Sequence, residues 1–327
     1  VDGEGGGGGG RGDGLADWWE MKYFGDLKAV DKSTDYDGEG LGDGDEYMRG
    51  SDPTDPDTDE DGLSDYDEVS VHGTDPLDPD TDNDGMEDGW EVENELNPLV
   101  DDALKDPDGD NFPNYYEYVR GGDPQDEGSI PTVAFSIDIS GTIQAALNAA
   151  TDNDIIMVES GIYRGEDNRE ISFDGKRVLL ISEEGPEETV IDCESSGRGF
   201  DFTNEEDKLS ILSGFSIIEG SASSGGAIYL HYSSPTIRNT IIKDNVVSQR
   251  GGGIAGYGSS SRIENCVLSA NEAEMGGGIY AYYSPLKLRN CTVYENSAYG
   301  GGGGIAAYSS DLGLLNTIIY FNTSLSL

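Results

Sequence analysis

The first of four similar stretches reads GGAIYLHYSSPTIRNTIIKDN and covers residues 225–245. The other three read GGGIAGYGSSSRIENCVLSAN (251–271), GGGIYAYYSPLKLRNCTVYEN (276–296) and GGGIAAYSSDLGLLNTIIYFN (302–322). One isoleucine column and two asparagine columns recur in step, every 25 or 26 residues: Ile228, Ile254, Ile279 and Ile305; Asn239, Asn265, Asn290 and Asn316; Asn245, Asn271, Asn296 and Asn322. Columns that stay in phase indicate that equivalent residues stack one coil above another, about 4.8 Å apart, as in a parallel β-helix.

The residue types in these stretches suit a coiled solenoid. Stacked asparagine amides bond to the amide above and to the exposed backbone of a bend. Paired glycines let neighbouring coils turn closely without a clash at Cβ. Short apolar strands are predicted between the asparagine columns, at 240–242, 266–268, 291–293 and 317–319. At about 25 residues per coil, residues 142–327 predict some seven coils.

The residues ahead of the repeat extend the same pattern. Residues 142–150 (TIQAALNAA) predict a short helix with one apolar face, and strands are predicted at 155–158, 178–181 and 189–192. Residues 133–327 resemble the right-handed parallel β-helix of the pectin-lyase-like superfamily, which implies that this helix caps the N-terminal end. The pairing of GG[AG]I with [ILV]-x-x-N also resembles the GGAI and FxxN motifs of polymorphic outer-membrane proteins. The expected fold class is mainly β, a right-handed parallel β-helix, and this scaffold carries both enzymes and adhesins.

A second pattern, made of acidic residues, runs from residue 33 to residue 124. Its clearest copy reads D-x-D-x-D-G-L-x-D-x-x-E and consists of Asp57, Asp59, Asp61, Gly62, Leu63, Asp65 and Glu68. This is a twelve-position calcium loop, because a hard divalent ion takes six to eight oxygens and alternate positions of a tight loop point inward. Positions 1, 3 and 5 supply carboxylates, position 7 a backbone carbonyl, position 9 usually a water-mediated contact, and position 12 an acid from the following short helix.

Three further copies raise the expected number of calcium ions to about four. The expected ligands are Asp35, Asp37, Glu39, Leu41, Asp43 and Glu46; Asp80, Asp82, Asp84, Met86, Asp88 and Glu91; and Asp106, Asp108, Asp110, Phe112, Asn114 and Glu117. The last copy has Asn111 where the turn glycine is expected, which is tolerable because asparagine also adopts a left-handed backbone. A partial fifth site is expected near Asp13–Glu20, where Arg11 and Gly9 stand at the first two ligand positions.

The spacing of the loops suggests a known kind of repeat. The loops begin 22, 23 and 26 residues apart, with proline corners such as Asp52-Pro53 and Asp75-Pro76 between them. Residues 10–125 resemble thrombospondin type 3 repeats, and each loop is similar to the calcium half of a dockerin. Paired EF-hands are excluded because the prolines forbid an entering helix. The expected organisation is a glycine-rich segment at 1–14, calcium repeats with short helices at 15–125, a linker at 126–132, and the β-helix with its cap helix at 133–327.

The charge of the chain argues against two classes of partner. The chain has 66 acidic and 19 basic side chains, a net charge of −47, so it is too acidic for a nucleic-acid binder and is disfavoured at an anionic membrane surface. Residues 1–130 alone hold 41 acidic and 7 basic side chains, which repel one another without metal. Weak calcium sites fill only at millimolar calcium, so a secreted, extracellular or cell-surface location is expected. No run of 18 or more apolar residues predicts membrane insertion.

The coils contain no catalytic constellation that the sequence can identify. Polysaccharide lyases of the superfamily that the chain resembles place clustered aspartates and an arginine or lysine base on one strand face. The acids of the repeating coils are isolated, and His231 has no carboxylate in its own coil to orient it. We therefore expect no enzymatic activity, with a polysaccharide lyase as the least favoured alternative.

One column of side chains is expected to face outward from the coils. Strand alternation places His231, Tyr257, Tyr282 and Tyr308 opposite the buried isoleucines. Such a stripe could stack on sugar rings or dock a neighbouring subunit, or it could only stabilise the coils, and the sequence leaves these alternatives open. Cys266 and Cys291 share another column and are expected to be stacked buried thiols, because parallel neighbours in register rarely offer disulfide geometry.

The sequence ends at Leu327 without a capping segment, and three explanations stay open. The first explanation is that the sequence is cut at this point, and the second is that a disordered tail follows. The third is that another subunit covers the end of the stack, which would generate a head-to-tail filament. The favoured interpretation is a secreted, non-enzymatic structural protein of a microbial cell surface or extracellular appendage, rigid only with calcium bound. The alternative is an adhesin or glycan-binding module that uses the tyrosine column.

Overall fold

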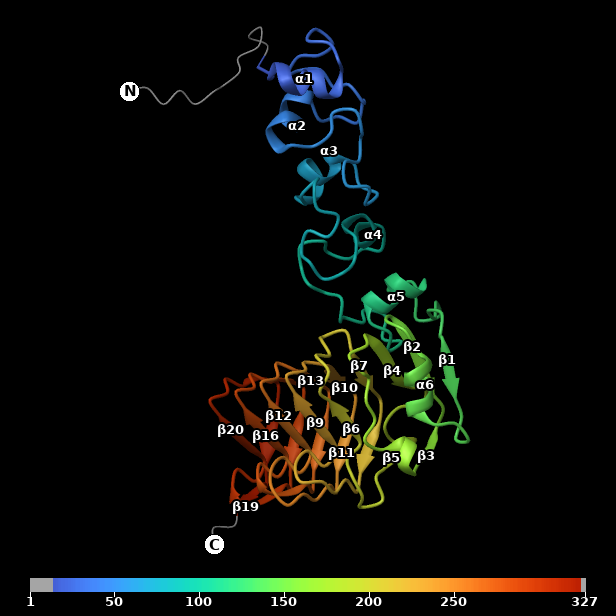
Figure 1. The fold of residues 1–327 in the computed structure, drawn as a ribbon, viewed down its shortest axis with the longest axis vertical. Coiled ribbons are helices and arrows are strands. Elements are labelled where there is room, and N and C mark those ends of the chain that lie inside the picture. Colours follow the sequence, from blue (N-terminus) through green and yellow to red (C-terminus); the bar gives the residue numbers. More distant parts are fainter. Residues whose placement is uncertain (1–13, 325–327) are drawn as a thin grey trace, which may run out of the picture. The chain divides into compact units, whose positions relative to one another are not determined.

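The computed structural model describes residues 14–324, and the chain divides after Pro131 into two compact units (Figure 1). The glycine-rich segment expected at 1–14 thus lies outside the described residues, apart from Gly14. Each unit is described by itself. Within residues 14–324, no helix is long and apolar enough to cross a membrane.

The first unit consists of acidic loops that each run into a short helix. Every one of these four helices begins at loop position 9, which places the position-12 glutamate one turn further along. At position 6 the glycines have φ values of 102° to 120°, and Asn111 has 79°, so the expectation that asparagine adopts the left-handed turn is confirmed. The four helices that follow the complete loops are α2 (Asp43–Arg49), α3 (Asp65–Asp67), α4 (Asp88–Glu93) and α5 (Asn114–Arg120). The unit also contains α1 (Asp17–Tyr23) and the π-helix Glu68–His72, which continues α3.

The apolar side chain at loop position 7 is buried in every loop of the first unit. Leu41, Leu63, Met86 and Phe112 are 5%, 9%, 0% and 4% exposed. A small separate core forms around Trp19 on α1, whose ring centroid lies 5.4 Å from that of Tyr47. Each loop therefore buries one apolar side chain.

The second unit is a parallel β-solenoid of about seven turns, which confirms the expected fold class (Figure 1). All pairings between its described strands are parallel. The eight-stranded sheet contains β1 (Phe135–Ile137), β2 (Asp154–Val158), β4 (Val178–Ser182), β7 (Ile211–Ser213), β10 (Thr236–Arg238), β13 (Arg262–Glu264), β17 (Lys287–Arg289) and β21 (Gly313–Leu315). The seven-stranded sheet contains β3 (Gly161–Tyr163), β5 (Thr189–Asp192), β8 (Ser216–Ile218), β11 (Ile241–Lys243), β14 (Val267–Ser269), β18 (Thr292–Tyr294) and β22 (Ile318–Tyr320).

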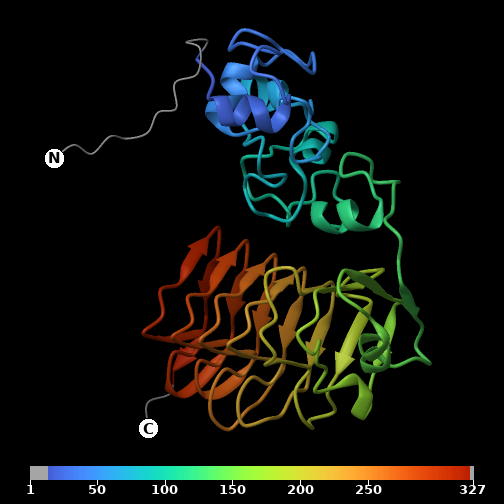
Figure 2. The same cartoon turned by 45° about the horizontal axis from the view of Figure 1, so that its top comes forward.

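Two smaller sheets complete the coils of the second unit. The five-stranded sheet contains β6 (Phe200–Phe202), β9 (Ile228–His231), β12 (Ile254–Tyr257), β16 (Ile279–Tyr282) and β20 (Ile305–Tyr308). The three-stranded sheet contains β15 (Glu272–Met275), β19 (Ser297–Gly301) and β23 (Thr323–Ser324). The coils follow one another in sequence order from green to red (Figure 2).

The predicted isoleucine column stacks in register inside the solenoid. Ile254 pairs with Ile228 on one side and with Ile279 on the other, and all three are fully buried. The strands expected at 240–242 and 266–268 begin one residue later. Thr240 and Cys266 instead occupy the corner before each strand, where the Thr240 hydroxyl donates to the Arg238 carbonyl at 2.8 Å and the Cys266 thiol to the Glu264 carbonyl at 3.1 Å.

Asparagine ladders and close glycine approaches hold neighbouring coils together, as predicted. In the outer ladder the Asn265 amide donates to Asn239 Oδ1 at 3.2 Å and the Asn290 amide to Asn265 Oδ1 at 3.0 Å. A Cβ on Gly277 would lie 2.5 Å from the carbonyl oxygen of Gly303 in the next coil, so only glycine fits there. Cys266 and Cys291 are free and buried, which confirms buried thiols in place of a disulfide, and Cys193 is also free and buried.

A short helix closes the N-terminal end of the solenoid. Helix α6 (Ile143–Ala149) begins after Thr142, whose hydroxyl accepts a hydrogen bond from the Ala145 N–H at 3.4 Å. Ile143 and Leu147 are buried among the core residues of the first coils. The predicted cap helix is therefore present, and a 3-10 turn at Glu166–Asn168 packs against it.

Candidate calcium sites and an aromatic face

The loops of the first unit bring the carboxylates at positions 1, 3 and 5 together. In each of three loops these groups offer oxygens within 4.8 Å of one another: Asp35, Asp37 and Glu39; Asp57, Asp59 and Asp61; Asp80, Asp82 and Asp84. In the fourth loop, the negative charges of Asp110, Asp108 and Asp106 all raise the pKa of Glu117, so these aspartates lie near that carboxylate. Clusters of carboxylate oxygens at this spacing are the donor set that calcium takes.

The four position-12 glutamates provide the test of whether a cation fits. Glu46, Glu68, Glu91 and Glu117 are fully buried. Both carboxylate oxygens of Glu46, Glu91 and Glu117 lack a hydrogen-bond donor, whereas Glu68 accepts one bond, from the Thr74 hydroxyl at 3.2 Å. A buried carboxylate without donors is costly unless a positive charge faces it. These oxygens therefore fit a bound divalent cation.

The pKa values of the same glutamates show how strongly they need such a charge. Burial, followed by the negative charges of neighbouring aspartates, raises the pKa of Glu46, Glu68 and Glu117 from 4.5 to about 8 and that of Glu91 to about 9. The same causes raise the pKa of Asp59 to about 7 and that of Asp82 to about 6. Proton uptake and cation binding therefore compete at these oxygens.

Some loop carboxylates also brace the loop backbone. In the second and third loops the position-1 aspartate accepts a hydrogen bond from the position-6 N–H: Asp57 from Gly62 at 3.0 Å, and Asp80 from Gly85 at 2.9 Å. Such bonds hold the left-handed turn that brings positions 1, 3 and 5 onto one side. The loop shape is therefore set in part by the groups that would bind the ion.

Position 9 has a structural contact that the sequence motif does not reveal. In the first three loops its carboxylate accepts from the position-2 N–H: Asp43 from Tyr36, Asp65 from Thr58 and Asp88 from Thr81, at 2.8 to 3.0 Å. The motif assigns this position a water-mediated ion contact. The water-mediated contacts and the carbonyl contacts of Leu41, Leu63, Met86 and Phe112 remain predictions.

A second kind of acidic group spans neighbouring loops. Asp61 and Glu68 of the second loop offer oxygens within 4.8 Å of Asp88 from the third, and Asp84 and Glu91 do so with Asp102. All members are buried. Because the motif treats each loop alone, the sequence reasoning did not select Asp102. The signal that could have indicated it is Asn114, which stands at position 9 where the other loops have aspartate.

The partial fifth site is only partly covered by the structure. Asp13 and the residues before it lie outside the described range, so the structure does not address their expected role. Glu20, the expected position-12 acid, lies on α1 and is buried.

The predicted outward column forms a continuous aromatic face on the five-stranded sheet. Tyr257 pairs with His231 and with Tyr282, and Tyr282 pairs with Tyr308. His231 is exposed, Tyr257 is half-buried, and Tyr282 and Tyr308 are each 42% exposed. Strand alternation thus places these four side chains outside the coil.

Tyrosines from a neighbouring column fill the space beside this stripe. The Tyr257 ring lies 5.6 Å from the rings of both Tyr229 and Tyr280. Tyr280 is only 4% exposed, because the guanidinium of Arg250 lies 5.2 Å over its ring. Arg198 lies in the same way over Tyr229, at 4.6 Å. The accessible aromatic surface is therefore smaller than the number of tyrosines suggests.

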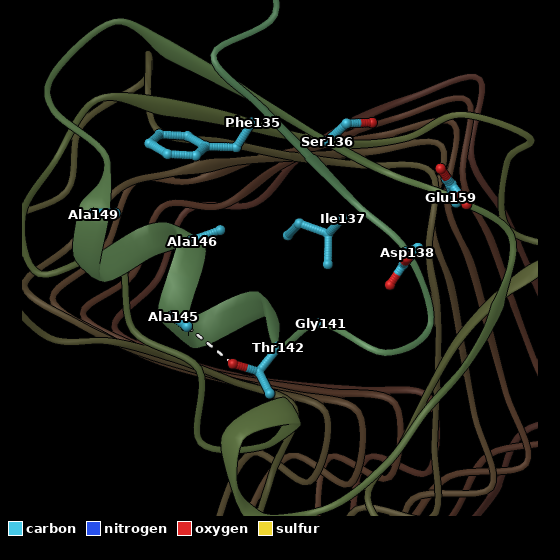
Figure 3. Close-up of a pocket in the computed structure, with 10 residues that line it drawn as sticks. All are labelled: Phe135, Ser136, Ile137, Asp138, Gly141, Thr142, Ala145, Ala146, Ala149 and Glu159. Atoms are coloured by element: carbon cyan, nitrogen blue, oxygen red, sulfur yellow. Dashed lines mark hydrogen bonds between the residues drawn. The ribbon is translucent and has the colours of Figure 1, made fainter.

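A hollow of about 440 Å³ lies between β1 and α6 (Figure 3). Its lining includes Phe135, Ile137 and alanines of α6, and Asp138 and Glu159 supply its charged groups. None of the residues selected from the sequence lies there. The hollow belongs to the cap of the solenoid and brings no cluster of catalytic or metal-binding groups together.

Two family matches agree with this geometry. Residues 57–79 and 80–100, which contain the second and third loops, match the bacterial TSP3 repeat, and residues 148–324 match the right handed beta helix region. No curated protein and no solved structure matches the chain. The second match covers more than half of the chain and the coils described above. The chain therefore belongs to the family of proteins with a right handed beta helix region, and in it this region follows bacterial TSP3 repeats.

Proposed function

We propose that the protein is a secreted, non-enzymatic structural protein of a microbial cell surface or extracellular appendage, whose acidic unit becomes rigid when it binds calcium. The observation that carries the proposal is the set of four fully buried position-12 glutamates, three of which have no donor to either carboxylate oxygen. Calcium at these positions satisfies oxygens that the protein itself leaves without partners.

The charge of the acidic unit explains why calcium would control its rigidity. Of the net charge of −47, 34 units lie in residues 1–130. Four calcium ions would cancel eight of these charges. At about 1 mM calcium and a dissociation constant of about 0.1 mM, each ion adds about 1.4 kcal/mol to the free energy of unfolding. Four such contributions are comparable to the stability of a small domain.

The location outside the cell follows from the same argument. Calcium loops of extracellular modules bind in the range of about 0.1 to 1 mM, and cytosolic calcium would leave such sites empty. A structural unit that depends on weak calcium sites is therefore suited to an extracellular medium.

Calorimetry with the full chain tests the proposal. A calcium titration is expected to show about four loop ions, and chelation is expected to expose the first unit to limited proteolysis while the solenoid stays intact. The solenoid is an internal control because the position-12 glutamates lie outside it. The proposal would be ruled out if the chain bound no calcium in the millimolar range. It would also be ruled out if EDTA did not change the proteolysis pattern.

A glycan-binding role is a second candidate, favoured by the in-register stripe of His231, Tyr257, Tyr282 and Tyr308. Exposed aromatic rings at a regular spacing suit stacking on successive sugar rings. The double variant Tyr257→Ala and Tyr282→Ala is expected to abolish retention on a glycan array. The control is Tyr294→Ala, because Tyr294 lies on β18 of a different sheet and stacks on Tyr320. Equal glycan binding by both variants would exclude the stripe as the glycan-binding site.

Lyase activity and self-association remain to be tested directly. A polysaccharide lyase produces an unsaturated sugar that absorbs in the ultraviolet, so incubation with polyuronates at millimolar calcium decides this alternative. Association with a second copy is decided by light scattering in calcium and in EDTA, since a calcium-gated polymer would lose mass on chelation.

A further inference from the structure

In the second and third loops, the aspartate at position 9 marks a recurring contact with the preceding loop. The N–H of the residue after this aspartate donates to the position-5 carboxylate of the preceding loop. Tyr66, which follows Asp65, donates to Glu39 at 2.7 Å, and Gly89, which follows Asp88, donates to Asp61 at 3.1 Å. The aspartate itself therefore lies beside the preceding loop, and Asp88 offers an oxygen within 4.8 Å of Asp61 and Glu68.

The fourth loop breaks this arrangement at two positions. Position 2 is Pro107, which has no N–H for a position-9 carboxylate to accept. Position 9 is Asn114, which is fully buried. Its side-chain amide donates to the backbone carbonyl and to Oδ1 of Asp102, both at 3.1 Å. Asn114 is thus directed toward another acidic residue of the same unit.

Asp102 reproduces the contacts that position 9 makes elsewhere. Ala103, the residue after it, donates its N–H to the position-5 carboxylate of Asp84 at 2.8 Å, as Gly89 does to Asp61. The N–H of Asp102 donates to the same oxygen at 2.8 Å. Asp102 is 5% exposed, and its carboxylate lies in a buried group with Asp84 and Glu91.

A second observation indicates that the group of Asp84, Glu91 and Asp102 needs a positive charge. Glu91 is fully buried, and neither of its carboxylate oxygens has a hydrogen-bond donor. The cation nearest to Asp102 among the described contacts is Lys105, whose amino group lies 3.4 Å from Asp102 Oδ2. The Lys105 side chain is 60% exposed, so it adds little to the buried group.

We propose that Asp102 takes the place of the missing position-9 aspartate and completes, with Asp84 and Glu91, a calcium site shared by the third and fourth loops. Asn114 is a positioning residue that orients the Asp102 carboxylate. The proposal rests on the calcium-binding function argued above. Its consequence is that the connection between these two loops depends on a residue outside the loop motif.

Native mass spectrometry of the full chain at saturating calcium tests this site by counting ions. Asp102→Asn is expected to bind one ion fewer than the unaltered chain, whereas Asp102→Glu, which keeps a carboxylate, retains the full count. The control is Asp78→Asn, which removes the same charge from an exposed corner of the same unit. Near-UV circular dichroism in calcium checks that each variant keeps its packed aromatic residues.

Each failure points to a different part of the account. An unaltered chain that binds no calcium would refute the proposed function itself. A full ion count in Asp102→Asn, with calcium still bound elsewhere, would refute only the shared site. Loss of one ion in both Asp102→Asn and Asp102→Glu would refute the ligand role, because packing and not the carboxylate would then be what matters.

Discussion

Asn271 and Asn296 lie in adjacent coils and are joined by two hydrogen bonds to one oxygen. The backbone N–H of Asn271 donates to Asn296 Oδ1 at 3.0 Å, and its side-chain amide donates to the same atom at 2.9 Å. Asn271 in turn accepts from Asn245 in the coil before, and all three residues are fully buried. The side chains of this inner asparagine ladder therefore provide, at a buried bend of the solenoid, the hydrogen bonds that water would otherwise provide.

The inner ladder predicts a large loss of stability on truncation. Asn271→Ala removes the acceptor of Asn245 and leaves the Ile242 carbonyl without its donor, so the free energy of unfolding is expected to fall by about 3 kcal/mol. Urea unfolding followed by far-UV circular dichroism measures the change. The comparison is Asn265→Ala in the exposed outer ladder, for which about 1 kcal/mol is expected. Equal losses would contradict the role of the buried ladder.

Glu117→Gln is expected to weaken calcium binding at the fourth loop by at least about tenfold, since it removes a buried anionic ligand. In EDTA the same variant is expected not to destabilise the first unit, because the carboxylate that it removes has no donor there. Calorimetry and thermal unfolding measure the two effects. Glu127→Gln, an exposed residue of the same unit, serves as the control. A variant with unchanged calcium affinity would exclude Glu117 as a ligand.

The raised pKa values predict opposite pH dependences with and without calcium. Glu46 and Glu68 have a pKa of about 8 in the folded chain against 4.5 as the reference value. In EDTA their contribution to stability is complete below about pH 4.5 and is lost as the pH rises through 8, so the first unit becomes less stable from pH 5 to pH 9. In millimolar calcium the bound ion requires the deprotonated form, and stability is expected to rise over the same range.

Urea unfolding at pH 5, 7 and 9, in both EDTA and calcium, checks this reversal. The solenoid is expected to unfold in a second transition that EDTA does not move, because the calcium loops lie outside it. Stability curves that run parallel in the two conditions would mean that protons and calcium do not compete at these glutamates.

Gly89→Ala is expected to separate the second and third loops. A Cβ at this position would lie 2.3 Å from the backbone oxygen of Asp61, and the Gly89 N–H bonds to the Asp61 carboxylate. The clash is against backbone, so a cost of about 2 to 4 kcal/mol is expected in thermal unfolding with calcium present. Gly128→Ala is the matched change, because its Cβ would meet only the tip of the Asp126 carboxylate, at 3.3 Å. Equal stability of the two variants would show that the loops can move apart.

Much of the fold could be predicted because the constant spacing within each of the two repeats identifies which residues occupy equivalent positions. The phase of Ile228, Ile254 and Ile279 gives the stacking of the coils, since parallel strands in register pair equivalent residues. The boundaries of the strands could not be predicted in the same way. Thr240 and Cys266 are apolar or small enough for a strand, but their side chains bond to the backbone of the corner.

The candidate sites could be predicted within one loop but not between loops. The motif specifies Asp80, Asp82 and Asp84 by sequence spacing, and their oxygens do converge. Asp102 reaches the same loop through hydrogen bonds across 18 residues, a contact that depends on how the loops pack. The burial of Tyr280 could not be predicted for a similar reason, because Arg250 covers its ring from outside the strand.

Hydrogen exchange of the full chain in millimolar calcium and after chelation tests the central claim most directly. The decisive amides are those of Gly62, Gly85 and Asn111, which donate to the position-1 aspartates. If calcium makes the acidic unit rigid, chelation is expected to speed their exchange by about a hundredfold or more, while the buried strands of the solenoid keep their protection. Unchanged protection of these three amides after chelation would contradict the account.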